Sequence, residues 1–345
     1  MVEIAKAISF DVKVLIMDEP TSVLTMKDTQ VLFRLIKKLA ARGIGIVYIT
    51  HRLGEIKEIA DRVVVLRDGE FVASKKIEEV SERVIAKLMV GREISQSIAG
   101  NFKGSADDIA VEMRNVNSGI LRGISFRVSK GEIVGFSGLI GAGRSELMEV
   151  LFGFRKCQSG EVLLNGKPVT IRSARAAIAH GMAFSTEDRK ETGLILCRGM
   201  SENMEYIRQV KTKGLLNNPR QANIRSVRMI DRLNIRCISP KQLVKNLSGG
   251  NQQKVVLAKW LEVNPDIFIV DEPTRGIDVG ARAEIYRIIN DLAKEGKTVL
   301  VVSSDLTEVL SICQRIIVMH EGKITGEFIG NDRTEENIMN CAANV

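Results

Sequence analysis

The sequence predicts an α/β fold built on a mainly parallel sheet with helices on both faces. Three observations support this prediction: an internal repeat, a glycine-rich turn that joins a strand to a helix, and short apolar strands that alternate with helical stretches. The chain has 345 residues, which is long for one compact domain and indicates about two. We therefore expect two related α/β domains.

The internal repeat determines this organisation. The segment VLIMDEPTSVLT at 14–25 resembles IFIVDEPTRGID at 267–278, and the offset of 253 residues is kept without a break across about 50 residues, as far as Gly69 and Gly322. Residue 1 corresponds to residue 254 at this offset, so the first copy matches only the later part of the second. We expect the first copy to be the remnant of a domain whose front is absent.

The domain boundaries follow from this register. A polar, Gly- and Ser-containing stretch at 91–108 lacks apolar periodicity and separates the copies. We expect a C-terminal remnant of the first domain at 1–92, a linker at 93–107 and a complete second domain at 108–345.

The second copy shows the alternation of elements most clearly. Residues 131–138 form an apolar strand that leads into the glycine-rich turn and then a helix at 145–153. The other expected strands are 111–116, 124–128, 267–273, 297–304 and 315–324, and further helices are expected at 255–263 and 284–296.

Composition narrows the function classes. The net charge of +8 permits phosphate-rich partners, but the basic residues are scattered and only 4% of residues are aromatic, which leaves little to stack on exposed bases. No apolar run approaches the ~18 to 20 residues of a membrane helix. Five cysteines lie far apart without a CxxC pair, which favours reduced thiols inside a cell over disulfides or a zinc site.

The glycine-rich turn has the spacing GxxxxG[KR][ST] between Gly138 and Ser145. Glycines let backbone N–H groups converge on one point, and the helix N-terminus adds a positive dipole end, so the turn suits nucleotide phosphates. Ser145 is placed to ligate Mg²⁺. Arg144 stands where such loops normally carry Lys; it keeps the charge but is bulkier and planar, which predicts altered binding geometry. The alternative is a tight turn without a ligand.

An acidic pair follows a buried strand in each copy. Asp271 and Glu272 end the apolar run 267–270, and Asp18 and Glu19 repeat the arrangement. Open parallel sheets bind ligands at the carboxyl ends of their strands. We expect Asp271, and Asp18 in the first copy, to hold a metal. Glu272 is expected to act as the general base on an attacking water.

Two further segments point to the same sheet edge. The run LSGGNQQ begins at Leu247, and its Ser248 and glycines can form a second nest of backbone donors for phosphate. This run is also compatible with an ordinary helix cap. His51 follows an apolar strand in the first copy and could reach a terminal phosphate. The second copy has Ser304 at that position, so the two copies differ chemically.

Together the phosphate loop, LSGGNQQ, the DEPT segments and the His/Ser position resemble the ATP-binding subunits of ABC transporters. The nearer likeness is to the fused two-domain ATPases of bacterial monosaccharide importers of the ribose type, through GLIGAGRSE, STEDRK, LSGGNQQK and DEPTRGIDVGA in the second copy and ITHRLGEI and LMVGRE in the first. By this resemblance the chain is an N-terminally truncated member with P-loop NTPase-type sheets, and a helical subdomain at about 191–253.

The resemblance implies an ATPase that couples ATP hydrolysis, with Mg²⁺, to sugar import at the cytoplasmic face of a bacterial membrane. Its partners would be membrane-spanning permease subunits and, through them, a substrate-binding protein; a homodimer is possible and no nucleic acid is expected. Glu19, His51 and Glu272 would be catalytic, and Ser145, Asp271 and Asp18 would face the metal. The nucleotide would meet Gly138, Gly141, Ala142, Gly143, Arg144, Ser145 and Glu146, and a second nucleotide would meet Ser248, Gly249, Gly250 and Gln252.

This arrangement places each ATP between the phosphate loop of one domain and the LSGG segment of the other. The first copy contains neither segment, so we expect weak ATP binding and little hydrolysis by the chain alone. Two alternatives stay open: a soluble ABC ATPase that acts on ribosomes or nucleic acid, and a non-catalytic fragment that only binds nucleotide.

Overall fold

The computed structural model describes residues 6, 12–21, 26–50, 53–67, 70–81, 84–85, 88, 108–212 and 218–343. The chain divides into two compact units, the first comprising Met1–Ile94 with Asp278–Gly280 and the second comprising Ser95–Ile277 and Ala281–Val345. The expected linker at 93–107 lies outside the described residues. The two units are considered separately below.

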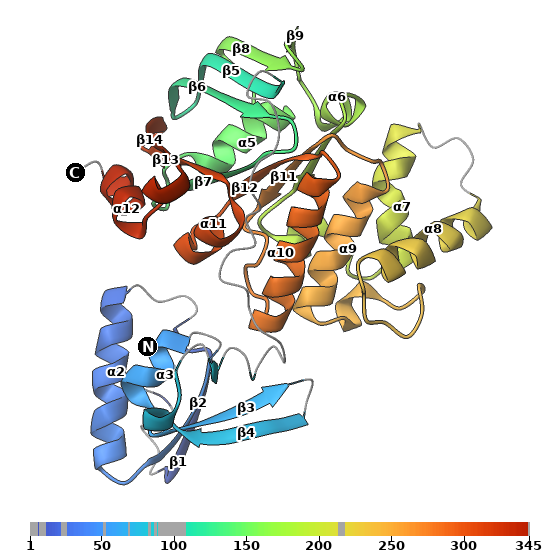
Figure 1. Ribbon diagram of the computed structural model, residues 1–345. Helices are drawn as coiled ribbons and strands as arrows, with labels where there is room; N and C mark the ends of the chain where they lie inside the picture. The colour runs from blue at the N-terminus through green and yellow to red at the C-terminus, as the bar shows by residue number, and fades with distance from the viewer. Residues whose placement is uncertain are drawn as a thin grey trace. The chain divides into compact units, whose positions relative to one another are not determined.

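The second unit is built on a six-stranded sheet with the strand order β10-β11-β12-β7-β13-β14 (Figure 1). Every neighbouring pair is parallel except β13 and β14. This confirms the predicted mainly parallel sheet. The bounds are β7 Ile133–Gly138, β10 Met182–Ser185, β11 Ile267–Asp271, β12 Thr298–Val302, β13 Arg315–His320 and β14 Lys323–Ile329.

A smaller antiparallel sheet, in the order β6-β5-β8-β9, belongs to the same unit. Strands β5 and β6 were expected from their apolar alternation. Strands β8 and β9, which follow the phosphate-loop helix along the chain, were not among the expected strands. Arg122 donates its backbone N–H to the carbonyl of Gly322 at 2.8 Å, which joins this sheet to the turn after β13. The bounds are β5 Ile109–Ser118, β6 Leu121–Ser129, β8 Ser159–Leu164 and β9 Lys167–Val169.

Helices surround the six-stranded sheet. In Figure 1, α7 and α8 lie on the side of the unit away from β13, β14 and α12. Both fall within the expected helical subdomain at 191–253, and α9 begins inside it. The bounds are α5 Arg144–Phe152, α6 Ala174–Ala179, α7 Met200–Lys211, α8 Pro219–Arg232, α9 Gly249–Leu261, α10 Val279–Lys294, α11 Leu306–Ile312 and α12 Glu335–Ala343, with short turns η2 Arg189–Gly193, η3 Val244–Asn246 and η4 Gly330–Asp332.

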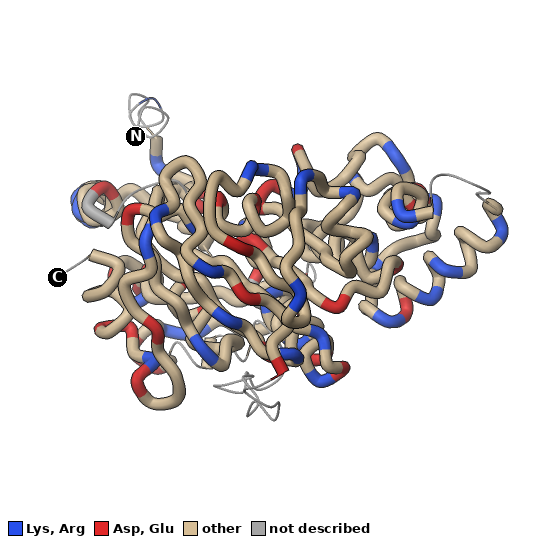
Figure 2. The backbone as a smooth tube through the Cα atoms, turned by 90° about the horizontal axis from the view of Figure 1, so that it is seen from above, with Lys and Arg blue, Asp and Glu red and all other residues tan. Residues whose placement is uncertain are grey.

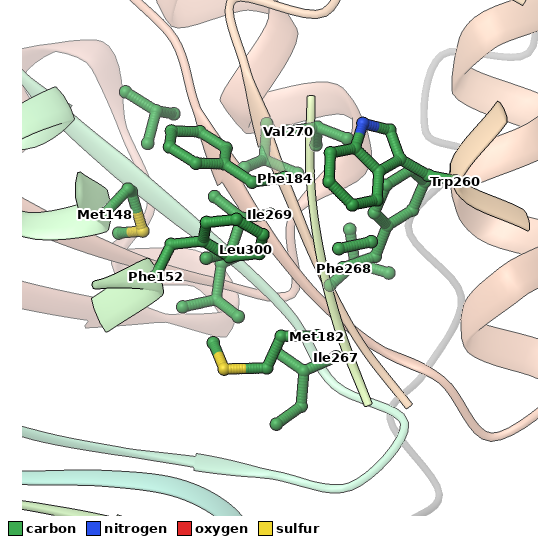
Figure 3. Close-up of a cluster of buried hydrophobic side chains, with 14 of the residues drawn as sticks. Met148, Phe152, Met182, Phe184, Trp260, Ile267, Phe268, Ile269, Val270 and Leu300 are labelled. Atoms are coloured by element: carbon green, nitrogen blue, oxygen red, sulfur yellow. The ribbon is translucent and has the colours of Figure 1, made fainter. Parts of the chain in front are cut away.

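The core of the second unit is continuous across the sheet. Each of β11 and β12 contains four consecutive apolar residues, Ile267–Val270 and Val299–Val302. These residues are nearly inaccessible to solvent, as expected for parallel strands covered on both faces. Figure 3 draws Ile269 and Leu300 among Met148, Phe152 and Phe184. The Phe152 ring packs at 5.4 Å from Phe184 and 5.7 Å from Trp260, measured between ring centroids, which fixes α5 against α9 and β10.

The first unit contains β1, α2, β2, α3, β3, β4 and η1, and it repeats the last part of the second unit. Strands β1 and β2 pair in parallel, and β3 and β4 form a hairpin whose register shifts between Val65 and Leu66. The second unit has its matching shift between Val318 and Met319, at the same offset of 253. The bounds are β1 Val14–Asp18, α2 Met26–Ala41, β2 Gly45–Ile49, α3 Leu53–Ile59, β3 Arg62–Arg67, β4 Glu70–Lys76 and η1 Ile77–Glu79, each 253 residues before its counterpart.

Charge is spread over the chain. Figure 2 shows Lys and Arg along most elements with Asp and Glu interspersed. The helices of the described residues were searched for a membrane span, and none is both long and apolar enough to be one.

Candidate nucleotide site

The phosphate loop joins the end of β7 to the start of α5. Gly138, Gly141 and Gly143 all adopt positive φ angles, of 150°, 84° and 96°. At Gly138 a Cβ would lie 2.3 Å from the carbonyl oxygen of Met319, so a side chain is excluded by contact as well as by conformation. The glycine spacing that predicted an anion cradle therefore matches a loop whose backbone requires glycine.

Arg144 points into the unit. Its guanidinium is largely buried and donates to the carbonyl oxygen of Ser303 at 2.6 Å. A second nitrogen lies 3.9 Å from a carboxylate oxygen of Glu272. The residue that departs from the usual Lys thus links the phosphate loop to the ends of β11 and β12. A charge-assisted hydrogen bond of this kind holds its partners more firmly than a neutral one.

Asp271 lies at the end of β11 with an exposed fraction of 3%. Its Oδ1 is one of the few buried side-chain atoms of the described residues that have no hydrogen-bond partner. Burial raises the pKa of this carboxyl to about 6, and a hydrogen bond from Ser145 acts in the opposite direction. A buried carboxylate with an unused oxygen beside a hydroxyl is a plausible chemical match for a cation.

Glu272 follows in a left-handed backbone conformation with φ of 46°. Its N–H donates to the carbonyl of Val302 at 2.8 Å, and its carboxylate accepts the N–H of Ser304 at 2.8 Å. Burial raises the pKa of Glu272, while the hydrogen bond from Ser304 and the charge of Arg144 favour the ionised form. The carboxylate is thereby held at the carboxyl edge of the sheet beside the phosphate loop.

A magnesium ion fits this set of donors. Mg²⁺ in nucleotide sites is bound by one or two protein oxygens together with phosphate oxygens and water. Asp271 and Ser145 supply such oxygens, and a bound cation would lower the pKa of Asp271 again by favouring its charged form. In the described parts of the chain, no group of three or more His, Cys, Asp or Glu side chains converges.

The LSGGNQQ segment caps α9. Ser248 is the N-cap residue, and its exposed hydroxyl accepts the side-chain amide of Asn251 at 2.9 Å. Gly249 and Gly250 are packed closely: a Cβ on Gly250 would lie 2.4 Å from that of Ala281. Gln252 is buried and donates to the carbonyl of Val244 at 3.2 Å. Ser248 is therefore accessible to a ligand, whereas the amide of Gln252 is engaged within the unit.

Arg189 was not singled out from the sequence as a site residue. Its guanidinium donates to the carbonyl oxygens of Arg275 and Gly276 at 2.6 and 2.9 Å, and a longer bond of 3.4 Å reaches Gln252. A further ion pair joins Glu187 to Arg275. These bonds tie the segment after β10 to both the LSGGNQQ helix and the DEPTRG turn. Only the run of charges in STEDRK could have indicated this role.

The buried carboxyl of Glu308 is hydrogen-bonded to the DEPT turn. Thr274 donates its hydroxyl to Glu308 at 2.8 Å, and Glu308 is 1% exposed. Burial raises the pKa of Glu308 to about 7, opposed by hydrogen bonds from Ser303 and Thr274. The sequence repeat aligned Glu308 with Glu55 but did not indicate this contact, because it forms only when α11 packs beneath the turn.

The first unit repeats the acidic turn without a phosphate loop. Glu19 has a φ of 44°, and its N–H donates to the carbonyl of Ile49 at 2.9 Å, as Glu272 does to Val302. Asp18 ends β1 and is exposed, whereas its counterpart Asp271 is buried. His51, expected to face a terminal phosphate, lies outside the described residues.

Comparison with known proteins identifies the family. The family described as "ABC transporter" matches residues 121–275, which span the phosphate loop, the LSGGNQQ segment and the DEPT turn. The ribose import ATP-binding protein RbsA of Geobacillus kaustophilus (strain HTA426) is 44% identical over 344 residues, covering 99% of this chain and 69% of the relative. The chain belongs to the ABC transporter family, among the ATP-binding proteins of sugar importers.

A second relative shows a similar degree of identity and coverage. The ribose import ATP-binding protein RbsA of Caldanaerobacter subterraneus subsp. tengcongensis is 46% identical over 341 residues, covering 98% of this chain and 69% of the relative. The chain thus spans about two thirds of the length of these relatives. The ABC group identified from sequence motifs is confirmed.

Solved structures confirm the ABC cassette fold. A nucleotide-free ATP-binding cassette from an ABC transporter aligns with a TM-score of 0.58 at 22% identity, over 68% of this chain and 95% of that chain. A dimeric bacterial ABC transporter cassette aligns with a TM-score of 0.56, also at 22% identity, over 64% of this chain and 98% of that chain.

Proposed function

We propose that the second unit binds ATP together with Mg²⁺ and hydrolyses it. The observation that carries this proposal is the convergence of the glycine-rich loop, the unpartnered oxygen of buried Asp271 and the held carboxylate of Glu272 at one edge of the sheet. Loop N–H groups from Gly138 to Ser145 would bind the phosphates. Magnesium, when bound, would neutralise phosphate charge, and Asp271 and Ser145 would hold it.

Glu272 would act as the general base. Its carboxylate must be ionised to accept a proton from water, and the raised pKa brings its proton affinity closer to that needed near neutral pH. Ser304, through its N–H, orients the carboxylate. Arg144 pairs with the Glu272 carboxylate and donates to the Ser303 carbonyl. In this arrangement its guanidinium positions the base.

Nucleotide binding and turnover of the purified full chain test this proposal. We expect Glu272→Gln to reduce ATP hydrolysis by about 10² to 10⁴ while ATP binding, measured by equilibrium dialysis, persists. Glu161→Gln is the matched control, because Glu161 is exposed on β8. Equal turnover in both variants would assign the activity to a contaminant and would contradict the role of Glu272.

A complete hydrolytic site needs a second cassette. Ser248 and Gly249 would face a nucleotide bound to another phosphate loop, whereas Gln252 is buried and donates to the carbonyl of Val244. In the first unit Asp18, Glu19 and His51 would serve that second nucleotide. The exposure of Ser248 at the start of α9 supports this arrangement. The chain alone would then turn over slowly. A homodimer offers one way to complete the site, and sedimentation with ATP and Mg²⁺ would detect it.

The energy of hydrolysis would drive a monosaccharide importer of the ribose type, at the cytoplasmic face of a bacterial membrane. The support is the family membership and the similarity of the chain to two ribose import ATP-binding proteins. Permease subunits would be the direct partners, and a substrate-binding protein would act through them.

An apolar groove in the second unit is a suitable permease contact. It has a volume of about 650 Å³ and is lined by aromatic side chains from both the sheet core and the helical part, among them Phe184, Tyr206 and Trp260. Lys259 also lines the groove and donates to the carbonyl of Gly193, and burial lowers its pKa to about 8. Of the three aromatic side chains Tyr206 is exposed, whereas Phe184 and Trp260 are buried. Concave sites lined by apolar and aromatic side chains are typical of binding sites.

Co-expression with a ribose-type permease tests the partner. We expect Tyr206→Arg to abolish recovery of the chain with permease-containing membranes, because Tyr206 lines the groove and is half exposed. Ile238→Arg is the control, since Ile238 is exposed elsewhere in the unit and is not among the groove residues. Loss of recovery in both variants, or in neither, would argue against the groove.

A further inference from the structure

Positive charge is concentrated in one segment of the second unit, residues 218–246. This segment holds seven Lys or Arg residues and one acidic residue, Asp231, so its net charge is +6 against +8 for the whole chain. The basic residues, which we expected to be scattered, therefore gather here, and the rest of the chain is close to neutral. The helix at the right edge of Figure 2, which is α8 in Figure 1, carries blue positions along its length.

Helix α8 presents one side to solvent. Its inner side is buried at positions that recur with the spacing of a single helix face. On the opposite side Ile224 is 59% exposed and Val227 is 41% exposed. Arg220 and Arg228 are exposed there as well, each about one helical turn from Ile224. We call these four residues, Arg220, Ile224, Val227 and Arg228, the outer face of α8.

The other two arginines of α8 are engaged within the unit. Arg225 donates to Glu205 of α7 at 2.6 Å, and Arg232 donates to Glu295 at 2.7 Å. By contrast, the two arginines of the outer face form no ion pair with any carboxylate in the described ranges of the chain. Their charge is therefore available to an anion from outside the unit.

The chemistry of the outer face discriminates among anionic partners. Single-stranded nucleic acid is bound through aromatic side chains that stack on its bases, and residues 218–246 contain no aromatic residue. A small anion in solution would pair with the arginines but would leave Ile224 and Val227 in water. An anionic bilayer offers phosphate groups to arginine and, directly below them, an apolar layer to aliphatic side chains. It is the partner that uses all four residues.

We propose that the outer face of α8 contacts an anionic lipid bilayer directly. Arg220 and Arg228 bind the lipid phosphates, and Ile224 and Val227, which lie between them along the helix, pack at the boundary with the acyl chains. A helix that lies in the membrane interface is stabilised by both effects together. This contact needs neither a permease nor ATP, so it is separate from the groove at Tyr206 and from the nucleotide site.

The contact is weak and sensitive to salt. Each arginine near an anionic bilayer strengthens binding by about fivefold, and the attraction falls off within a Debye length. Two arginines and two aliphatic side chains therefore give reversible binding. The outer face supplements the contact with a permease and does not replace it, so firm recovery with membranes still depends on the groove.

Co-sedimentation with lipid vesicles tests this contact. The full chain is mixed, without nucleotide and at low salt, with vesicles of phosphatidylglycerol and phosphatidylcholine or with vesicles of phosphatidylcholine alone. We expect binding to the anionic vesicles only, and weaker binding as the salt concentration is raised. Equal binding to both kinds of vesicle, or binding to neither, would overturn the proposal.

Charge variants localise the contact to α8. Arg220→Gln/Arg228→Gln should weaken binding to the anionic vesicles by about 30-fold. The matched control is Arg172→Gln/Arg175→Gln, which removes the same charge at two exposed positions near the start of α6 and should bind nearly as the unaltered chain does. Equal loss in the two double variants would contradict the proposal, because net charge alone would then drive binding.

A further variant tests the apolar part of the outer face. Ile224→Gln keeps the charge and introduces a good helix former, and it should weaken vesicle binding by at least about threefold. Vesicle binding that depends on the arginines but not on Ile224 would make the face a simple anion site and would argue against insertion at the bilayer. The fluorescence of Trp260 should be unchanged in every variant, because all the altered side chains are exposed.

Two soluble polyanions distinguish the remaining partners. Polyuridylate represents a nucleic acid, and polyglutamate represents an acidic protein surface. We expect neither to bind more tightly than the anionic vesicles at the same salt concentration. Tighter binding of either one, lost in Arg220→Gln/Arg228→Gln, would assign the outer face to that class of partner and not to a bilayer.

Discussion

The two copies have the same local structure but different burial. Each strand and helix of the first unit repeats in the second at a fixed offset, down to the register shift in the hairpin. Ile16 is 67% exposed, however, and its counterpart Ile269 is inaccessible. The comparison shows that nearby sequence suffices to specify backbone and turn geometry, whereas burial depends on segments from elsewhere in the chain.

The acidic turns at Glu19 and Glu272 also share local structure but differ in their longer-range contacts. Glu19 and Glu272 both adopt a left-handed backbone, and each donates its N–H to the strand next to it. Thr21 donates to Glu55 at 2.7 Å, as Thr274 does to Glu308. In the second unit Arg144, which belongs to the phosphate loop, also pairs with Glu272. The shared contacts are therefore structural, and the unshared ones distinguish the proposed catalytic site.

The largest expected difference in stability is between substitutions of Ile269 and of its counterpart Ile16. Ile269→Ala should destabilise the second unit by about 2 to 5 kcal/mol, because it leaves a cavity in a closed core. Ile16→Ala should change stability by less than about 0.5 kcal/mol, because the side chain is already exposed. Urea unfolding followed by Trp260 fluorescence reports on the second unit, and hydrogen exchange reports on the first. Equal destabilisation at both positions would show that the side chain of Ile16 is covered by another segment.

The next effect concerns the buried carboxyl of Glu308. Its pKa is about 7 in the folded unit against an ordinary 4.5, so the folded state binds the proton more tightly than the unfolded state. Stability from this group is present below about pH 4.5 and is lost as the pH rises to about 7. Glu308→Gln should remove this loss, which amounts to about 3 kcal/mol at most.

Unfolding of Glu308→Gln and the unaltered chain across pH 4.5 to 7, followed by Trp260 fluorescence, measures this difference. Glu335→Gln is the control, because Glu335 is exposed at the start of α12. Its stability should depend on pH as that of the unaltered chain does. A parallel pH dependence in Glu308→Gln would mean that Glu308 is not the group that titrates.

The third effect concerns Arg144, which lies at the start of α5 in the second unit. Arg144→Met should destabilise the second unit by about 1.5 to 3 kcal/mol through loss of the bond to the Ser303 carbonyl. It should also raise the pKa of Glu272 further by removing a favourable charge. The pH profile of any ATP turnover would then shift upward, whereas an unchanged profile would show that Arg144 does not influence Glu272.

The smallest effect should be the same in both copies. Thr21→Val and Thr274→Val each remove one hydroxyl donor to a glutamate and should each cost about 1 kcal/mol. Hydrogen exchange of the amides in each acidic turn measures both variants in one experiment. Comparable losses would support a structural role for this bond, while a much larger loss in the second unit would link it to the site that only that unit has.

Much of the fold and part of the site were predictable from sequence. The apolar strands, the repeat and the glycine spacing are local patterns, and the parallel sheet and the phosphate loop followed from them. The contacts of Arg189 and Glu308 were not predictable, because their partners lie 34 or more residues away. Arg144 was expected at the phosphate from its place in the motif, but its direction depends on β12 lying beside β7.

The sequence by itself determined which residues form strands, which turns need glycine, and where the carboxylates Asp271 and Glu272 occur, because these depend on neighbours along the chain. Only the tertiary structure decided that Asp271 is buried while Asp18 is exposed, and that Arg144 donates to the carbonyl of Ser303. Desolvation, and with it the raised pKa of Asp271 and Glu308, arises from atoms brought together across the sheet. The two copies share the local pattern, and long-range packing makes them differ.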